Sequence, residues 1–174
     1  MKKKFLVLVG LLMMSGTVFA NPLDKTIISY EPMVAAVVLT NGTESGSSAG
    51  YNFFGIHAGL IWDKLSVNLG FKGLFGNIEA DVGYNIVNND YVVWSAGGRI
   101  ALDSYVCPGF GLSTNVDGLI PITQKVHFDI GLGLGFCWYP TLAMTAGKAS
   151  GQDLSGYTCF TLELTPRVGV SIKQ

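Results

Sequence analysis

The chain has 174 residues, of which 49% are hydrophobic, 13% are charged and 23 are glycine, and its formal net charge is −1. A typical soluble domain carries about 25% charged residues and about 7% glycine. The apolar content excludes an intrinsically disordered chain, and glycines without a period of three exclude collagen. The length fits one domain, and no apolar run after the N-terminus approaches the ~18 residues of a membrane-spanning helix.

The N-terminus has the pattern of a secretory signal peptide. Three lysines at positions 2–4 precede an apolar stretch over residues 5–14, and Val18 and Ala20 place small residues at the −3 and −1 positions of a cleavage site. We expect residues 1–20 to be removed. The mature chain, residues 21–174, is then expected to form one domain in the cell envelope.

The mature chain alternates apolar and polar residues with a period of two. Ile78, Val82 and Tyr84, for example, alternate with Glu79 and Asp81. This period is typical of strands with one apolar face and one face that carries charge and glycine. The pattern predicts eight strands, near residues 33–40, 51–62, 65–72, 78–86, 91–102, 105–115, 126–136 and 160–172.

The predicted connections alternate between long and short. Polar segments at 40–50 and 139–156, with shorter ones at 73–77 and 103–104, fall at one end of the strands, and turn signals at 63–64, 88–90 and 117–118 fall at the other. Long extracellular loops and short periplasmic turns are typical of outer-membrane barrels. Aromatic residues near both ends predict interfacial belts: Trp62 and Tyr91 at the short turns, and Tyr51, Tyr105, Trp138, Tyr139 and Tyr157 at the long loops.

These features predict an all-β fold, a closed antiparallel eight-stranded up-and-down transmembrane β-barrel. The even strand number fits a closed bacterial barrel, and the predicted strand lengths fit a bilayer. In strand count, loop pattern and aromatic positions, the chain resembles the small eight-stranded outer-membrane β-barrel proteins of the OmpA/OmpX-like or opacity-protein type. That architectural resemblance implies a bacterial outer-membrane location and surface-exposed loops.

Charged residues occupy strand positions that alternate with the apolar ones. If the apolar positions face lipid, these charged positions point inward and predict a polar lumen. Because an eight-stranded barrel is only wide enough to be filled by side chains, buried charges inside it must be paired. We expect a salt-bridge network that plugs the lumen, with a proton or ion path as the alternative. The residues assigned to this network are Glu79, Asp81, Arg99, Asp129, Glu163, Arg167 and His57.

No motif for catalysis or metal binding stands out. The sequence has no Gly-x-Ser-x-Gly, and its two histidines, His57 and His127, have no neighbouring Cys or His that would complete a metal site. We therefore expect no catalytic residue, no cofactor and no metal. Two alternatives stay open: an outer-membrane lipid-modifying enzyme of the lipid A acyl hydrolase or transferase type, and a secreted lipocalin-like binder.

Three cysteines, Cys107, Cys137 and Cys159, have inward parity near the predicted outer strand ends. Disulfides form readily in an oxidising envelope. Cys137 and Cys159 flank the last long loop, so we expect a disulfide between them, with a bond between Cys107 and Cys137 as the alternative.

The loops are expected to carry recognition, because binding residues are concentrated on loops held by a rigid scaffold. The predicted role is structural or surface interaction through loops 40–50 and 139–156. The expected partners are outer-membrane lipid and an extracellular ligand or host surface. Nucleic acid is not expected, because no basic tract lies in the mature chain.

Overall fold

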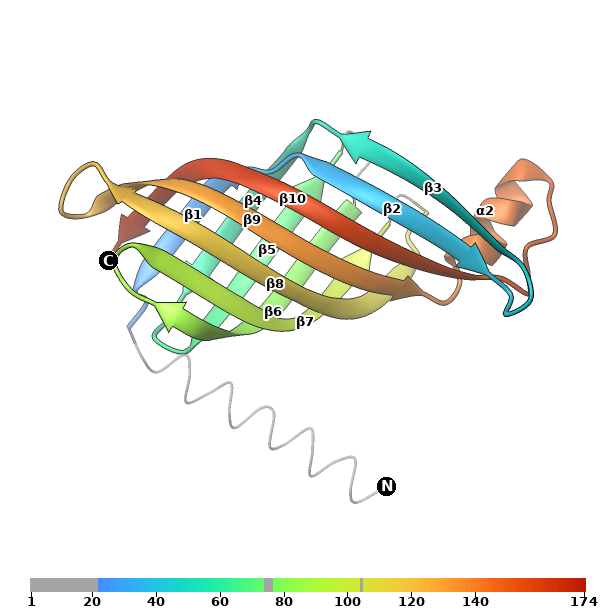
Figure 1. Cartoon of the computed structure of the whole chain (residues 1–174), viewed down its shortest axis with the longest axis horizontal. Coiled ribbons are helices and arrows are strands. Elements are labelled where there is room, and N and C mark those ends of the chain that lie inside the picture. The colour runs from blue at the N-terminus through green and yellow to red at the C-terminus, as the bar shows by residue number, and fades with distance from the viewer. Residues whose placement is uncertain (1–21, 74–76, 104) are drawn as a thin grey trace, which may run out of the picture.

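Figure 1 shows the computed structural model of the chain, in which residues 22–73, 77–103 and 105–174 are described. The predicted signal peptide, residues 1–20, lies outside the described residues. Among the described residues, the structure contains no helix with the length and apolar character needed to cross a bilayer. The described chain forms one antiparallel sheet and a short helix.

The sheet closes into a barrel. Its strands are hydrogen-bonded in the order β1-β4-β5-β6-β7-β8-β9-β10, and β10 pairs with β1 along residues 168–173 to complete the ring. This confirms the predicted closed eight-stranded fold. The strands are β1 (Lys25–Tyr30), β2 (Met33–Thr40), β3 (Ser45–Asn52), β4 (Gly55–Ile61), β5 (Leu65–Lys72), β6 (Asn77–Asn88), β7 (Val92–Leu102), β8 (Pro108–Pro121), β9 (Val126–Tyr139) and β10 (Thr158–Lys173).

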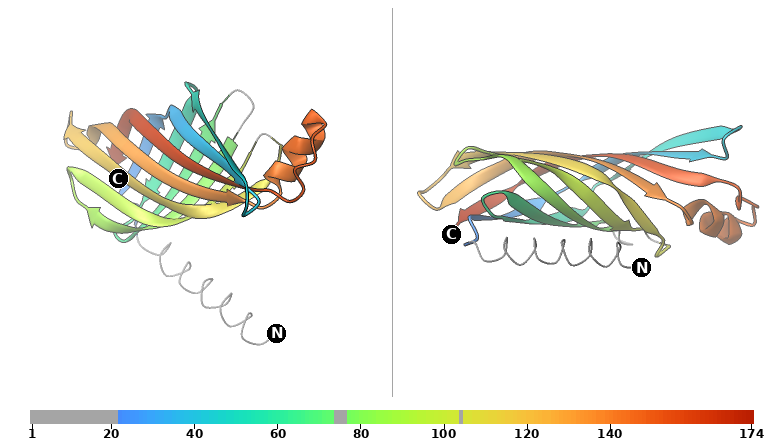
Figure 2. Two further views of the ribbon diagram at one scale, coloured as in Figure 1. Left: turned by 45° about the vertical axis from the view of Figure 1, so that its right-hand side comes forward. Right: turned by 90° about the horizontal axis from the view of Figure 1, so that it is seen from below.

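The first two strands of the barrel are each divided into two segments. Glu31 and Pro32 separate β1 from β2, and proline lacks the N–H that a continuous ladder needs. The chain is tightly packed at this break, because a Cβ on Gly55 would lie 2.0 Å from the Glu31 carbonyl oxygen. Past the break, β2 stays paired with β10 and takes β3 as its other neighbour. Figure 2 shows the resulting β2–β3 hairpin running beyond the closed wall.

The hairpin corrects the prediction of a long loop over residues 40–50. Only residues 41–44 form the turn, and Ser45–Asn52 is a strand whose residues are almost all exposed. Its run of Ser, Gly and Ala has no alternation, so the sequence pattern could not reveal it. The strand forms because β2 offers it a backbone ladder that reaches from Met33 to Thr40.

A second correction concerns the turn predicted at 117–118. Asp117 and Gly118 lie inside β8, and the turn to β9 falls at residues 122–125. The dipeptide Asp-Gly is a turn signal, but here the ladder to β9 and an ion pair of Asp117 in the lumen override it. The turns predicted at 63–64 and 88–90 coincide with the β4–β5 and β6–β7 connections. The predicted connections at 73–77 and 103–104 lie partly outside the described residues.

The barrel is apolar outside and polar inside. Ile78 and Val82 on β6 are 52% and 53% exposed, whereas Glu79 and Asp81 between them are 3% and 5% exposed. The same alternation continues around the wall.

Two aromatic residues that we predicted for the interfacial belts, Trp62 and Tyr139, are instead buried, with 8% and 1% exposure. The side chain of Tyr139 faces the lumen because its position in the alternation on β9 is an inward one.

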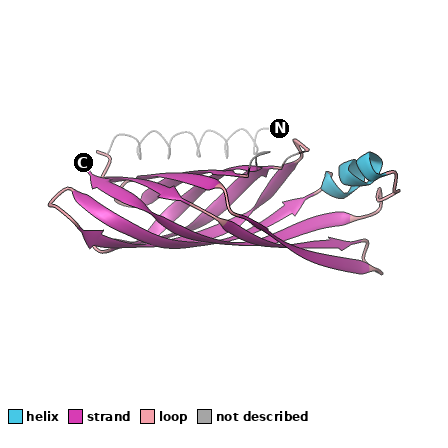
Figure 3. Ribbon diagram, turned by 90° about the horizontal axis from the view of Figure 1, so that it is seen from above, coloured by secondary structure: helices cyan, strands magenta, loops and turns pink. Residues whose placement is uncertain are grey.

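The loop predicted at 139–156 contains a helix, α2 (Leu142–Ser150). Figure 3 places this helix at the end of the barrel opposite the C-terminus. The helix ends at Gly151, whose φ of 75° gives the left-handed cap that glycine adopts without strain. Ala143 is buried in one cluster with Tyr139 and Cys159 at the barrel end, so α2 partly covers the mouth, whereas Gly147 packs against Leu154 of the following segment.

Candidate functional site

An ion cluster centred on Arg99 of β7 occupies the upper lumen. Arg99 donates from Nε and Nη2 to the two carboxylate oxygens of Asp81 at 2.8 and 3.0 Å, and the β6–β7 register sets these two residues opposite each other. Its Nη1 lies 2.7 Å from Glu163 Oε2 and 3.1 Å from Glu79 Oε2. The guanidinium fits because residue 135 is glycine, since a Cβ there would lie 2.0 Å from Arg99 Nη1.

Lys72 on β5 completes this upper cluster. Its Nζ is 2.6 Å from Glu79 Oε2 and 3.5 Å from Glu163 Oε2. Lys72, Arg99 and the three carboxylates are all buried. The cluster therefore joins β5, β6, β7 and β10 across the lumen through charge-assisted hydrogen bonds, which are stronger than neutral ones.

A second cluster surrounds Arg167 on β10, which is 1% exposed. Its Nη2 contacts Asp117 Oδ1 at 2.9 Å as an ion pair without hydrogen-bond alignment, and its Nη1 faces His57 Nε2 at 3.1 Å. Asp117 was missed in the sequence because it was assigned to a turn. Its parity with Ser113 and Asn115, which are also buried, is the signal that could have found it.

The structure thus divides the seven predicted lumen residues into three groups. Glu79, Asp81, Arg99 and Glu163 lie together, Arg167 and His57 lie with Asp117, and Asp129 accepts a hydrogen bond from Ser29 at 2.9 Å. His57 does not reach Glu79 or Asp81 as a carboxylate partner, since its Nε2 faces Arg167.

The lumen contains the three residue types of a hydrolytic triad: Ser29, His57 and Asp129. Ser29 stands opposite His57 in the β1–β4 register, and all three side chains are buried. In a triad the hydroxyl donates to the histidine, which the acid in turn orients. Here the Ser29 hydroxyl donates directly to Asp129, and the His57 ring nitrogen faces a guanidinium. The observed geometry differs from that of an activated nucleophile.

The three cysteines are free and buried. In the β9–β10 register Cys137 stands opposite Thr161, whereas Cys159 stands opposite Tyr139. The predicted pair is therefore diagonal, two residues out of register, and diagonal partners are about 7–8 Å apart. A disulfide needs a closer approach of its Cα atoms, and neither Cys137–Cys159 nor the alternative Cys107–Cys137 is bonded in this structure.

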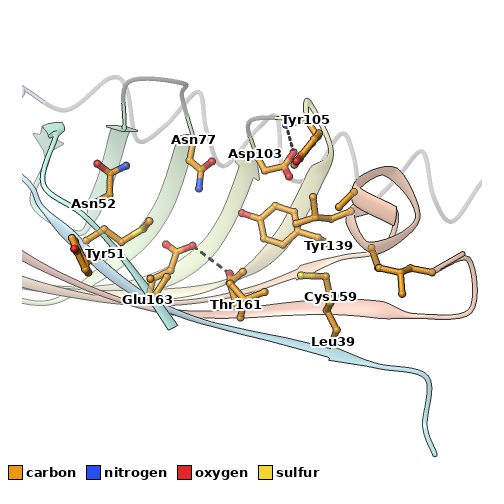
Figure 4. A pocket seen from close by; sticks show the side chains of 18 residues that line it. Leu39, Tyr51, Asn52, Asn77, Asp103, Tyr105, Tyr139, Cys159, Thr161 and Glu163 are labelled. Carbon is orange, nitrogen blue, oxygen red and sulfur yellow. Dashed lines mark hydrogen bonds between the residues drawn. The ribbon is translucent and has the colours of Figure 1, made fainter. Parts of the chain in front are cut away.

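Above the ion clusters the mouth of the barrel contains a cavity of about 440 Å³. Ala35, Val37 and Leu39 of β2 line one side of the cavity, and α2 lines the outer end. Figure 4 shows Tyr139 and Glu163 among the polar groups that face it. The interior therefore changes from charged at mid-barrel to largely apolar at the mouth.

A hydrogen bond outside the barrel wall links the two long surface segments. The hydroxyl of Tyr157, which follows α2, donates to Glu44 Oε2 in the β2–β3 turn at 2.7 Å. This bond to a carboxylate raises the pKa of Tyr157 above its usual value. The hairpin and the α2 segment are thus held as one surface.

No known family model matches the chain, and no curated protein matches it. Among solved structures, the chain is similar to Neisserial surface protein A, with 16% identity and a TM-score of 0.51, over 86% of this chain and 97% of that one. It is also matched to the attachment invasion locus protein Ail of Yersinia pestis in complex with the heparin analogue sucrose octasulfate, with 8% identity and a TM-score of 0.41, over 87% and 100% of the two chains. The first similarity shows the fold alone, a closed antiparallel β-barrel.

Proposed function

We propose that the protein resides in a bacterial outer membrane and acts there as a surface-interaction protein, without catalysis. The observation that carries this proposal is the joined outer surface of the β2–β3 hairpin and the α2 segment, which extends beyond the closed wall (Figure 2). The apolar exterior of the wall suits a bilayer, because closure satisfies the backbone of every spanning strand internally. We assign the partner contacts to this outer surface.

We further propose that the lumen is a structural plug. Arg99 binds three carboxylates and Arg167 bridges to Asp117, so side chains from opposite walls meet across the interior. Such a lumen supports the barrel as a rigid base for the outer surface and leaves no wide path for solutes. The expected partners are the surrounding lipid and an extracellular ligand or host surface.

Cysteine labelling in intact cells tests the orientation. Ser48 on β3 and Thr123 in the β8–β9 turn are both exposed, whereas the three native cysteines are buried and give little background. We expect a membrane-impermeant maleimide to label the Ser48→Cys variant in intact cells, and the Thr123→Cys variant only after the outer membrane is permeabilised. The reverse pattern would overturn the orientation.

Adherence tests the surface role. Cells carrying the wild-type protein are compared on epithelial monolayers with cells whose residues 45–50 and 142–155 are replaced by short Gly-Ser turns. A substitution of Thr123 and Gln124 in the opposite turn is the matched control. We expect adherence to fall several-fold for the replaced surface and to be unchanged for the control. Equal adherence of all three strains would contradict the proposal.

A further inference from the structure

The inward face of β2 is apolar at the outer end of the barrel. On β2 the inward positions are Ala35, Val37 and Leu39, whereas the inward positions around Arg99 carry charge. A separate apolar cluster in the interior consists of Ile27, Ile61, Val93 and Leu119. The three β2 side chains face the cavity of about 440 Å³ in the mouth. Ligand pockets usually measure about 300–1,000 Å³ and are mostly apolar, so this cavity has the size and lining of a binding site.

Buried groups hold the cavity open. The Tyr139 ring extends from β9 over the neighbouring strand β8, where a Cβ on Gly109 would lie 2.5 Å from the ring. On the outer side Ala143 of α2 is 1% exposed and packs in one cluster with Tyr139 and Cys159. An apolar cavity of about 150 Å³ already accepts benzene, and the present one is about three times larger.

The polar groups around the cavity select the charge of its occupant. Asp103 and Glu163 line it, and no lysine or arginine is among its described lining residues. Lys72 and Arg99 form ion pairs with Glu163 but are not among the described residues that line the cavity. A carboxylate or phosphate in the cavity would be repelled by these carboxylates, which carry the same charge. A hydrogen-bond donor could instead bind to them.

Tyr139 supplies the buried polar group that aims into this space. The residue is 1% exposed and is one of the residues that line the cavity. Figure 4 shows the hydroxyl pointing into the cavity. A ligand with a polar head in the cavity would therefore lie within reach of a hydroxyl that can donate or accept a hydrogen bond.

We propose that the mouth cavity binds a small amphiphile whose aliphatic body packs against β2 and α2 and whose uncharged or cationic head hydrogen-bonds to Tyr139 beside Glu163. The ligand class is an alkylamine or alkanol, and fatty-acid anions are disfavoured. The cavity shares the α2 segment and Gly50 of β3 with the outer surface assigned to partner contacts, and its floor reaches Glu163 in the lumen.

Matched six-carbon probes test the site on the full mature chain in zwitterionic lipid nanodiscs. Binding of hexylamine, hexanol and hexanoate is followed by saturation-transfer NMR, with empty nanodiscs as the control for partitioning into lipid. We expect saturable binding of hexylamine and hexanol, and at least tenfold weaker binding of hexanoate. Signals equal to those of empty nanodiscs, or equal binding of hexanoate, would overturn the proposal.

Neighbouring alanines on β2 provide a matched pair of variants. Ala35 faces the cavity, whereas Ala36 faces outward beside Leu162. Ala35→Phe should reduce hexylamine binding at least tenfold, and Ala36→Phe should leave it unchanged, with folding of both checked by gel migration. If Ala35→Phe does not fold, Ala146→Phe on α2 fills the same cavity from outside the wall. Tyr139→Phe should weaken hexanol binding several-fold. Unchanged hexylamine binding by the cavity-filling variants Ala35→Phe and Ala146→Phe would refute the site.

Discussion

At the scale of single residues, burial decides what each ion pair contributes. Arg99 is 3% exposed and serves three carboxylates, so removing it would leave uncompensated charge in the lumen. Breaking a buried pair in this way typically costs about 3–5 kcal/mol. The pair between Lys173 and Asp90 is exposed on both sides, and exposed pairs are screened by water.

We therefore predict that Arg99→Met lowers the free energy of unfolding of the barrel by about 3–5 kcal/mol. The measurement is urea unfolding in lipid vesicles, followed by the loss of the folded band on a gel. Lys173→Met is the control and should leave the midpoint almost unchanged. Equal midpoints for Arg99→Met and wild type would show that the network contributes no stability.

Two adjacent glycines on β7 test close packing of the wall. A Cβ on Gly97 would lie 2.0 Å from the backbone oxygen of Val82, whereas a Cβ on Gly98 would meet nothing within 4 Å. Gly97→Ala should destabilise the barrel by about 1–3 kcal/mol, the usual cost of overpacking, because the clash is with backbone. Gly98→Ala should be near neutral in the same unfolding assay. A Gly97→Ala variant as stable as wild type would contradict the β6–β7 register.

At the scale of elements, the hydrogen bond from Tyr157 to Glu44 couples the α2 segment to the β2–β3 turn. The carboxylate raises the pKa of this phenol, so the bond is present below the usual tyrosine pKa of about 10 and is lost as pH rises through the raised value. The coupling therefore operates at neutral pH.

Limited proteolysis tests this coupling. We predict that Tyr157→Phe speeds cleavage of the α2 segment at pH 7 several-fold, and that wild type shows the same loosening only above pH 10. Tyr91→Phe, in a turn at the other end of the barrel, is the control. Cleavage rates of Tyr157→Phe equal to wild type would mean that the segments are held by other contacts.

The sequence pattern was informative wherever one face of a strand is apolar. It predicted the alternation on β6 and the inward charges Glu79, Asp81 and Arg99, because each strand of a lipid-facing barrel must present its apolar side outward. It failed at β3, whose Ser, Gly and Ala residues carry no alternation, and at Asp117, where a tertiary ion pair overrides a local turn signal. It also missed the inward direction of Tyr139, because an aromatic residue near a strand end was assigned to the interfacial belt although the alternation on β9 places it inward.

At the scale of the whole molecule, the filled lumen determines what can cross the barrel. Side chains from β5, β6, β7 and β10 meet around Arg99, and a second cluster lies around Arg167. We predict little or no conductance when the purified barrel is reconstituted in a planar bilayer. Arg99→Met should produce at most brief, small openings. Large and stable openings of the wild type would refute the plugged lumen.

The assignment of the apolar face to lipid is tested most directly by cell fractionation and gel electrophoresis of the exported chain. An apolar exterior and a closed, ion-paired interior predict recovery in the outer-membrane fraction and faster migration when the sample is not boiled, since a closed barrel resists detergent. Recovery in the soluble periplasm, with identical migration before and after boiling, would contradict the assignment of the apolar face to lipid.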